Sequence, residues 1–155
     1  MQRTLTLSVI SLSVLMFSSC GGPKPLTLSS PDGGKHVVLQ VDIADTPQAR
    51  SEGLKYITQM PEDRGMLFVF PQEQLLAFWM QDTKIPLDIV FFDAEGRFIS
   101  GAEMRPCTQD PCPRYTAAEP GMYALEANSG FRVKNGIGMG WTLNVEEIKK
   151  ISNPS

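Results

Sequence analysis

The chain has 155 residues, of which 42% are apolar, 20% charged and 8% aromatic, and its formal net charge is −3. This composition is typical of one ordinary globular domain and excludes a disordered chain, a coiled coil and a two-domain enzyme of usual size. Because the protein is mildly acidic and has no basic run, we expect no nucleic-acid partner; such binding depends mostly on Lys and Arg neutralising phosphates.

The first residues have the features of a bacterial export signal. One arginine precedes the apolar stretch Leu5–Phe17, which is too short to span a bilayer of about 30 Å, since a spanning helix needs roughly 20 apolar residues. Ser18 and Ser19 lie before Cys20 and resemble the cleavage site of bacterial lipoproteins, in which the cysteine becomes the acylated N-terminus. We therefore expect a signal peptide over residues 1–19 and lipidation at Cys20. Cleavage after Cys20, with Ser18 as the required small residue, is the alternative.

The number of cysteines agrees with this prediction. Three cysteines in an exported protein leave one over once a pair has formed, and Cys107 and Cys112 are close in sequence and far from Cys20. In an oxidising envelope we expect a structural disulfide between Cys107 and Cys112. The alternatives are redox exchange, which usually uses a Cys-x-x-Cys spacing, and a zinc site, which would need more ligands than the single His36 could add. We therefore expect no metal and no cofactor.

Residues 20–35 are expected to form the lipidated cysteine and a flexible tether. Residues 21–35 contain three Pro and four Gly and show no apolar periodicity. At about 3 Å per residue, such a tether could hold the domain up to roughly 45 Å from the bilayer. Residues 36–151 are then expected to form a single domain.

Within this domain the dominant hydrophobic period is two, which is typical of β-strands. Thr46 and Pro47 predict the start of one short helix over residues 47–56. Asp93–Gly96 predicts a four-residue hairpin connection. The last segment, 145–151, is expected to form a frayed helical turn. The predicted strands are 36–43, 66–70, 76–81, 87–92, 98–101, 122–127 and 141–145. Together they indicate a mainly β fold, a compact sandwich or barrel with one short helix.

Several segments, in order, resemble domain-of-unknown-function family 192, a family of small bacterial and archaeal domains often found behind export signals. The matching segments are Ala44–Thr46 with Arg50 and Gly53-Leu54, Gly65–Phe70, Phe78–Met80 with Thr83, Ile85–Phe91, Pro106-Cys107 with Cys112-Pro113 and Tyr115, and Leu125-Glu126 with Gly130. The resemblance implies a jelly-roll-like β-sandwich and supplies no activity. The sequence departs from the family's pattern at Lys55, Ile57, Asp82 and Trp141.

Two carboxylates and one arginine are candidates for a site. Asp88 and Glu126 lie inside predicted strands, where an unpaired carboxylate costs several kcal/mol of folding free energy. By period two, Asp88 shares a face with Val90, and Glu126 shares one with Ala124. Arg50 on the predicted helix is a candidate partner through its bidentate fork. One interpretation is a structural clamp between helix and sheet; the other is a pocket in which an acid with a raised pKa acts as a general acid or base or anchors a ligand.

Trp79 is the fourth candidate. Beside Asp82, Thr83 and Lys84 its indole could form the stacking platform of a sugar or small-molecule site. Trp residues also cover the edge of a core with the N–H bonded there, and this second interpretation is preferred.

No phosphate-binding loop, paired-His motif or nucleophile elbow is present in the sequence, so an enzyme is not favoured. The favoured hypothesis is a lipid-anchored domain of the cell envelope, on the periplasmic or outer face, that binds a small ligand, a glycan or an envelope protein. One alternative is a carboxylate-dependent hydrolase of an envelope polymer, which would need Asp88 and Glu126 to flank one bond. The other is a structural or assembly lipoprotein.

Overall fold

The computed structural model describes residues 22–152, in which nine strands and three short helices follow one another. Their order is β1 (Lys24–Ser29), β2 (His36–Ala44), α1 (Pro47–Glu52), β3 (Arg64–Gln74), β4 (Ala77–Trp79), β5 (Leu87–Phe92), β6 (Phe98–Met104), β7 (Arg114–Thr116), β8 (Gly121–Asn128), α2 (Phe131–Asn135), β9 (Thr142–Leu143) and α3 (Val145–Ser152). The mainly β fold predicted from the sequence is confirmed. Helices α1 and α3 lie where a short helix and a terminal helical turn were predicted, and α2 is additional.

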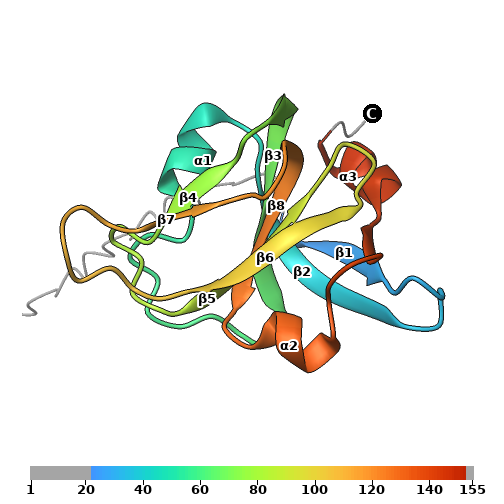
Figure 1. Ribbon diagram of the computed structural model, residues 1–155, viewed down its shortest axis with the longest axis horizontal. Coiled ribbons are helices and arrows are strands. Elements are labelled where there is room, and N and C mark those ends of the chain that lie inside the picture. The colour runs from blue at the N-terminus through green and yellow to red at the C-terminus, as the bar shows by residue number, and fades with distance from the viewer. Residues whose placement is uncertain (1–21, 153–155) are drawn as a thin grey trace, which may run out of the picture.

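Seven strands form one curled sheet in the order β6-β5-β8-β3-β2-β1-β9. All neighbours are antiparallel except β2 and β3, which are parallel because α1 lies in the connection between them. The first and last strands of this order meet at a bridge between Arg97 and Thr142, and the Phe98 N–H donates to the Trp141 carbonyl at 2.9 Å. The sheet therefore curls into a half-barrel (Figure 1), and these contacts join its two edges.

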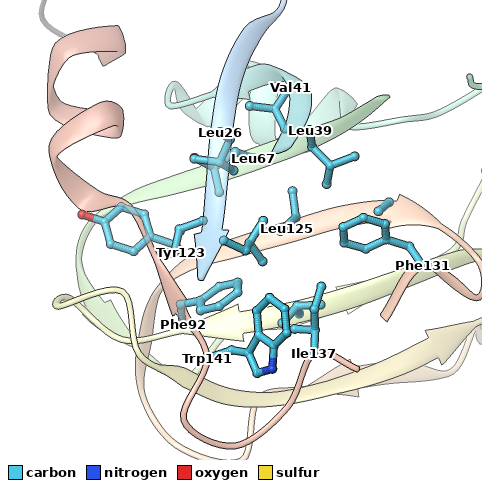
Figure 2. Packing of buried hydrophobic residues seen from close by; sticks show 14 of the residues in the cluster. Leu26, Leu39, Val41, Leu67, Phe92, Tyr123, Leu125, Phe131, Ile137 and Trp141 are labelled. Carbon is cyan, nitrogen blue, oxygen red and sulfur yellow. The ribbon is translucent and has the colours of Figure 1, made fainter. Parts of the chain in front are cut away.

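The inner face of the curl holds one hydrophobic core (Figure 2). Its centre is Leu125 on β8, which is fully buried, and Phe92 and Tyr123 lie beside it. Phe131 of α2 and Ile148 of α3 cover the open ends of this core. The other members are Leu26, Leu28, Leu39, Val41, Leu67, Val90, Ala127, Ile137, Trp141 and Leu143.

A second core lies on the opposite face of the same sheet. There the separate two-stranded ribbon of β4 and β7, together with the segment that follows α1, packs on β3, β5 and β8. Phe78 of the ribbon contacts the Phe68 ring edge-on, with ring centroids 4.9 Å apart. As a result, all six residues of β5 are buried, and the alternation expected for a half-buried strand is absent from it.

Helix α1 begins as predicted. Thr46 is extended, its hydroxyl accepts a hydrogen bond from the Ala49 N–H at 3.1 Å, and Pro47 occupies the first turn. The helix ends at Glu52, earlier than the predicted residue 56. Gly53 ends it with φ of 51° while its N–H bonds to the Ala49 carbonyl, a backbone conformation that glycine adopts readily.

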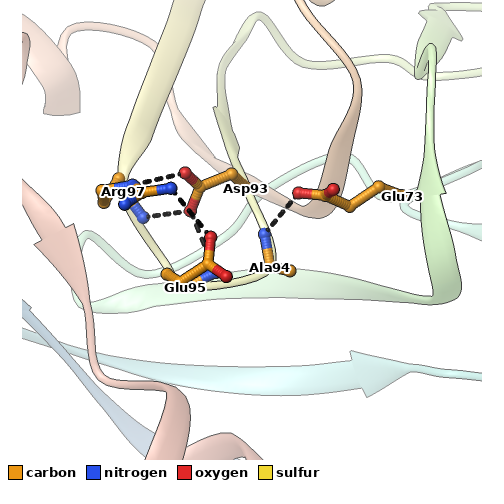
Figure 3. Close-up of polar contacts among 5 residues, drawn as sticks. All are labelled: Glu73, Asp93, Ala94, Glu95 and Arg97. Carbon is orange, nitrogen blue, oxygen red and sulfur yellow. Dashed lines mark hydrogen bonds and ion pairs between the residues drawn. The ribbon is translucent and has the colours of Figure 1, made fainter.

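The predicted hairpin at Asp93–Gly96 is confirmed between β5 and β6, and Gly96 has φ of 79°. Figure 3 shows the polar contacts that hold it. The Arg97 guanidinium donates to Asp93 at 2.6 Å and to Glu95 at 2.9 Å, and the Ala94 N–H donates to the Glu73 carboxylate of β3 at 2.9 Å. These contacts fix the turn next to β9, where the half-barrel closes.

The flexible tether expected over residues 20–35 is wrong for residues 24–29. Residues Lys24–Ser29 form β1, which pairs with both β2 and β9, and Leu26 and Leu28 are fully buried. The backbone hydrogen bonds of this short segment are completed by its two neighbouring strands, β2 and β9. The sequence of the segment itself does not indicate that these neighbours are present. Helix α2 was also not predicted, because five residues between Gly130 and Gly136 are too few to show a helical period.

The predicted signal peptide at residues 1–19 and the predicted lipidation site Cys20 lie outside the described residues. Between residues 22 and 152 the longest helix is α3 at eight residues, and none is long and apolar enough to cross a membrane.

Candidate functional site

Glu126 on β8 is the most unusual ionisable residue of the domain. It points to the second core, on the same face as Ile89, which lies directly opposite it on β5. Only 5% of its surface is exposed, and no side chain or backbone group of residues 22–152 forms a hydrogen bond or ion pair with its carboxyl group. Burial alone therefore raises the pKa of Glu126 from the ordinary 4.5 to about 8. At neutral pH this group is mostly a neutral acid, which can both donate and accept a hydrogen bond.

A small cleft reaches the Glu126 side chain from the surface. Its volume is about 40 Å³, and we call it the Glu126 cleft. One wall is α1 with the segment after it, and the other is the β4 ribbon with the turn that follows. Its lining residues are Arg50–Lys55, Phe68, Phe78, Trp79, Gln81, Thr83 and Glu126. Three of the four candidate residues from the sequence, Arg50, Trp79 and Glu126, therefore meet at one cleft.

Trp79 lies at the mouth of this cleft and is 47% exposed, so the preferred core role for it is wrong. The ribbon turns Phe78 inward onto Phe68 and Phe91, and the alternation of a strand then points Trp79 outward. The Arg114 guanidinium of the paired strand β7 lies over the indole, with Cζ 5.5 Å from the ring centroid. This contact holds a large aromatic surface at the entrance.

Arg50 does not form the predicted clamp with a carboxylate. Its Nη1 donates instead to the backbone carbonyls of Asp45 at 2.6 Å and Val69 at 2.8 Å, and its Cζ lies 5.0 Å from the Phe70 ring centroid. Arg50 therefore ties α1 to strand β3 through backbone oxygens. In this position the guanidinium forms part of the cleft wall and leaves Glu126 without a counter-ion.

Asp88 is the candidate residue that the structure separates from the others. It lies opposite Ala127 across the β5–β8 pair, whereas Glu126 lies opposite Ile89, so the two carboxylates point to opposite faces of the sheet. Asp88 accepts a hydrogen bond from the Arg132 N–H at 2.7 Å and so caps the first turn of α2. The pair of acids required for glycoside hydrolysis across one bond is therefore not formed by Asp88 and Glu126.

Two residues next to the cleft lining have left-handed backbone: Asp82, which was named beside Trp79 from the sequence, and Tyr56, which was not. Tyr56 has φ of 64° and Asp82 has φ of 62°, conformations that non-glycine residues rarely adopt. The Tyr56 N–H donates to the Asp82 carbonyl at 2.9 Å, which joins the segment after α1 to the turn after β4. Such strain is held only where the surrounding contacts enforce it, and it is common at functional sites. An Asp tolerates this conformation better than most residues, but no local signal marks Tyr56.

A second and larger cleft also borders Trp79 and runs along the loop that holds the two cysteines. Its volume is about 430 Å³, and we call it the loop groove. The predicted disulfide is confirmed there: Cys107 and Cys112 are joined, with their Cα atoms 5.6 Å apart. The groove is lined by Trp79, Gln81, Asp82, Lys84, Cys107–Cys112 and Arg114.

Replacing both Cys107 and Cys112 with Ser is expected to lower the free energy of unfolding by about 2 kcal/mol, because the loop that the bond closes is short. Urea unfolding of the double variant and the parent checks this value. Equal unfolding midpoints in the two proteins would mean that the loop is held by its other contacts and that the bond contributes no stability.

A wider cleft of about 620 Å³ lies elsewhere, between β2, the segment before β3 and α2. Three of its polar side chains, Glu62, Lys134 and Asn128, already have partners. Lys134 forms an ion pair with Glu62 at 2.9 Å, and the Asn128 amide donates to the Met60 and Pro61 carbonyls. It offers no buried ionisable group without a partner, so we place the candidate site at Glu126.

No three His, Cys, Asp or Glu side chains within residues 22–152 gather in a way that could hold a metal ion. The chemistry that the site offers is therefore described by Glu126, Thr83, Gln81 and the aromatic surface of Trp79. It can hold a polar group by hydrogen bonds and an apolar face by stacking.

Comparison with known proteins supports the fold and the family. The family DUF192, described as "Uncharacterized ACR", matches residues 28–145. Two similar solved structures are a protein from Sinorhizobium meliloti described as a candidate transcription regulator and a protein of unknown function from Novosphingobium aromaticivorans. The first is 30% identical, covers 78% of this chain and 92% of its own, and has a TM-score of 0.72. The second is 28% identical, covers 77% and 83%, and has a TM-score of 0.69. None of the curated proteins matches this chain.

Proposed function

Because this chain belongs to the DUF192 family, to which no activity is attached, we propose from its cleft that it is a ligand-binding domain of the cell envelope. Glu126 lies at the floor of the proposed binding site and Trp79 at its mouth.

The observation that carries the proposal is the buried, unpaired carboxyl group of Glu126. Burying an acid without a partner costs stability, and a buried acid beside a cleft with a strongly raised pKa is a common feature of functional sites. A ligand group with a hydrogen-bond acceptor would provide the partner that residues 22–152 do not provide. Since the acid is mostly neutral at pH 7, it would donate its proton into that hydrogen bond.

The volume of the Glu126 cleft limits what can enter it. About 40 Å³ holds about three or four groups of the size of a water molecule, since each needs roughly 10–15 Å³. Only a substituent of the ligand, such as a hydroxyl or amide group, would therefore reach Glu126. The body of the ligand would rest outside on the exposed indole of Trp79.

Binding is favoured over hydrolysis because of where the acids lie. Asp88 points to the opposite face of the sheet and accepts a hydrogen bond from the Arg132 N–H. The other carboxylate in the cleft lining, Glu52 on α1, is exposed and accepts a hydrogen bond from the Gln48 amide, so Glu126 is the buried acid of the cleft. A binding role needs only the donor and the aromatic platform.

The test uses the two tryptophans of the chain as reporters. On titration with N-acetylglucosamine at millimolar concentration, we expect the indole N–H resonance of Trp79 to shift while that of Trp141, which is 5% exposed, stays in place. Trp79→Ala should weaken binding by about tenfold or more, since a stacked aromatic contributes on the order of 1 kcal/mol beyond its area. Met139→Ala, which removes another exposed apolar side chain, is the control and should bind as the parent does. Resonance shifts confined to Val38 and Lys134 in the wider cleft would contradict the proposal.

The proposed location rests on the sequence around Cys20. With β1 beginning at Lys24, only residues 21–23 would separate an acylated Cys20 from the folded domain, a span of at most about 10 Å. The domain would then lie directly against the bilayer, and the partner of the protein would be the membrane through its lipid anchor.

We expect Cys20→Ser to move the protein from the membrane fraction to the soluble fraction, because two or three acyl chains anchor a protein firmly and their loss removes the anchor. Mass spectrometry of the parent should show the added mass of the acyl chains on an N-terminal Cys20. The double variant Cys107→Ser, Cys112→Ser is the control and should stay with the membrane. A parent protein that leaves the membrane without detergent would contradict lipidation.

A further inference from the structure

Trp79 belongs to the lining of both the Glu126 cleft and the loop groove, so the two clefts adjoin at this residue. The loop groove has about ten times the volume of the Glu126 cleft. Gln81 also lines both. A ligand that stacks on the indole and sends one substituent toward Glu126 would therefore have the loop groove next to it, with room for a further unit.

The polar lining of the loop groove is balanced in charge and in hydrogen-bonding capacity. It contains two acids, two cations and two amides: Asp82, Asp110, Lys84, Arg114, Gln81 and Gln109. Within residues 22–152, neither Lys84 nor Arg114 forms an ion pair; Arg114 lies over the Trp79 ring. Sugar hydroxyls both donate and accept, which fits such a mixed lining, whereas an acidic polymer or a nucleic acid would need a net positive one.

The loop that forms the outer wall of this groove is held in place before any ligand arrives. The disulfide closes it across five residues, and Tyr115 on the adjoining strand β7 accepts a hydrogen bond from the Arg105 N–H at 3.3 Å. A wall that is already ordered costs less conformational entropy on binding than a flexible loop would.

Resting on the proposed function, we propose that the ligand is an uncharged oligosaccharide of at least two units. One sugar ring stacks on Trp79 with a substituent directed to Glu126, and the next unit lies in the loop groove along Gln109 and Lys84. The two subsites adjoin at Trp79, so a longer sugar chain makes more contacts. Because the acids and cations of the loop groove balance, a charge on the sugar adds no affinity.

The experiment is isothermal titration calorimetry with β-1,4-linked N-acetylglucosamine chains of one to five units and with the matching glucose chains. We expect the affinity of at least one series to rise about tenfold or more from one unit to two or three and then to level off, as the added hydrogen bonds are completed. The double variant Lys84→Ala, Gln109→Ala should lose this gain and bind the single sugar as the parent does. Met139→Ala is the matched surface control.

Each contrary result has a distinct meaning. A single sugar that binds as tightly as the longer chains would overturn the two-subsite proposal and leave the proposed function intact. Tighter binding of oligogalacturonate of equal length would overturn the preference for uncharged chains. No heat and no shift of the Trp79 resonance with any sugar would overturn this inference, while a Trp79 shift with an uncharged non-sugar amide such as N-methylacetamide would still support the ligand-binding function. Circular dichroism of each variant confirms that it is folded.

Discussion

Replacement of Glu126 with Gln is expected to raise the free energy of unfolding at pH 9 by about 4 kcal/mol and to leave it nearly unchanged at pH 4.5. The pKa of this acid is about 8 in the folded protein and near the ordinary 4.5 when unfolded. Between these values the folded state binds more protons than the unfolded state, so the stability of the parent falls as pH rises from 4.5 to 8. Above pH 8 a charge is buried without a partner, and the loss is complete.

The measurement is urea unfolding of the parent and the variant at pH 4.5, 7 and 9. Glu119→Gln, on the exposed surface, is the control and should follow the parent at every pH. The Gln amide also keeps a donor at all pH values, so ligand binding, which should weaken above pH 8 in the parent, should persist in Glu126→Gln. Parallel stability curves for the parent and Glu126→Gln would show that the carboxyl group is solvated or paired in solution.

Gly96→Ala is expected to destabilise the domain by about 3 kcal/mol, which lowers Tm by roughly 10 °C. Gly96 has φ of 79°, where an added Cβ is strained, and that atom would overlap the Leu143 carbonyl oxygen and lie 2.8 Å from the Val145 side chain. The Leu143 N–H donates to the Gly96 carbonyl at 2.7 Å, so the substitution would open the contact at which the half-barrel closes.

Gly136→Ala separates the effect of backbone strain at positive φ from the effect of steric overlap of the added Cβ. Gly136 has φ of 71°, but nothing lies within 4 Å of an added Cβ, so only the backbone strain of about 1 kcal/mol is expected. Calorimetry of both variants gives the comparison. Equal losses of Tm would mean that strain alone matters at Gly96 and that the closure of the sheet contributes little to stability.

Local chemistry made several features predictable from the sequence. Thr46 and Pro47 mark the start of α1, Asp93–Gly96 marks the hairpin, and the short spacing of Cys107 and Cys112 allows the disulfide. Each depends on residues within about six positions of one another, and for this reason the sequence pattern was sufficient. The hydrophobic period of two likewise predicted the mainly β fold, and the family resemblance, which the family match over residues 28–145 confirms, implied a β-sandwich.

The candidate site was predictable only in part. Sequence periodicity assigned Asp88 and Glu126 to faces within their own strands, but the pairing of Asp88 with Ala127 and of Ile89 with Glu126 decided that these faces are opposite. Trp79 and Arg50 were identified as residue types suited to a site, whereas their actual contacts, with Arg114 and with two backbone carbonyls, come from other elements.

The sequence by itself therefore determined seven of the nine strands, one helix start, the hairpin and the cysteine pair, because these depend on near neighbours along the chain. The tertiary structure alone decided that Lys24–Ser29 is a strand inside the sheet and that β5 is covered on both faces. It also decided that Glu126 is buried without a partner beneath Trp79. Strand register and burial depend on elements that are distant in sequence. The hydrophobic pattern of one strand does not specify which strands pair with that strand.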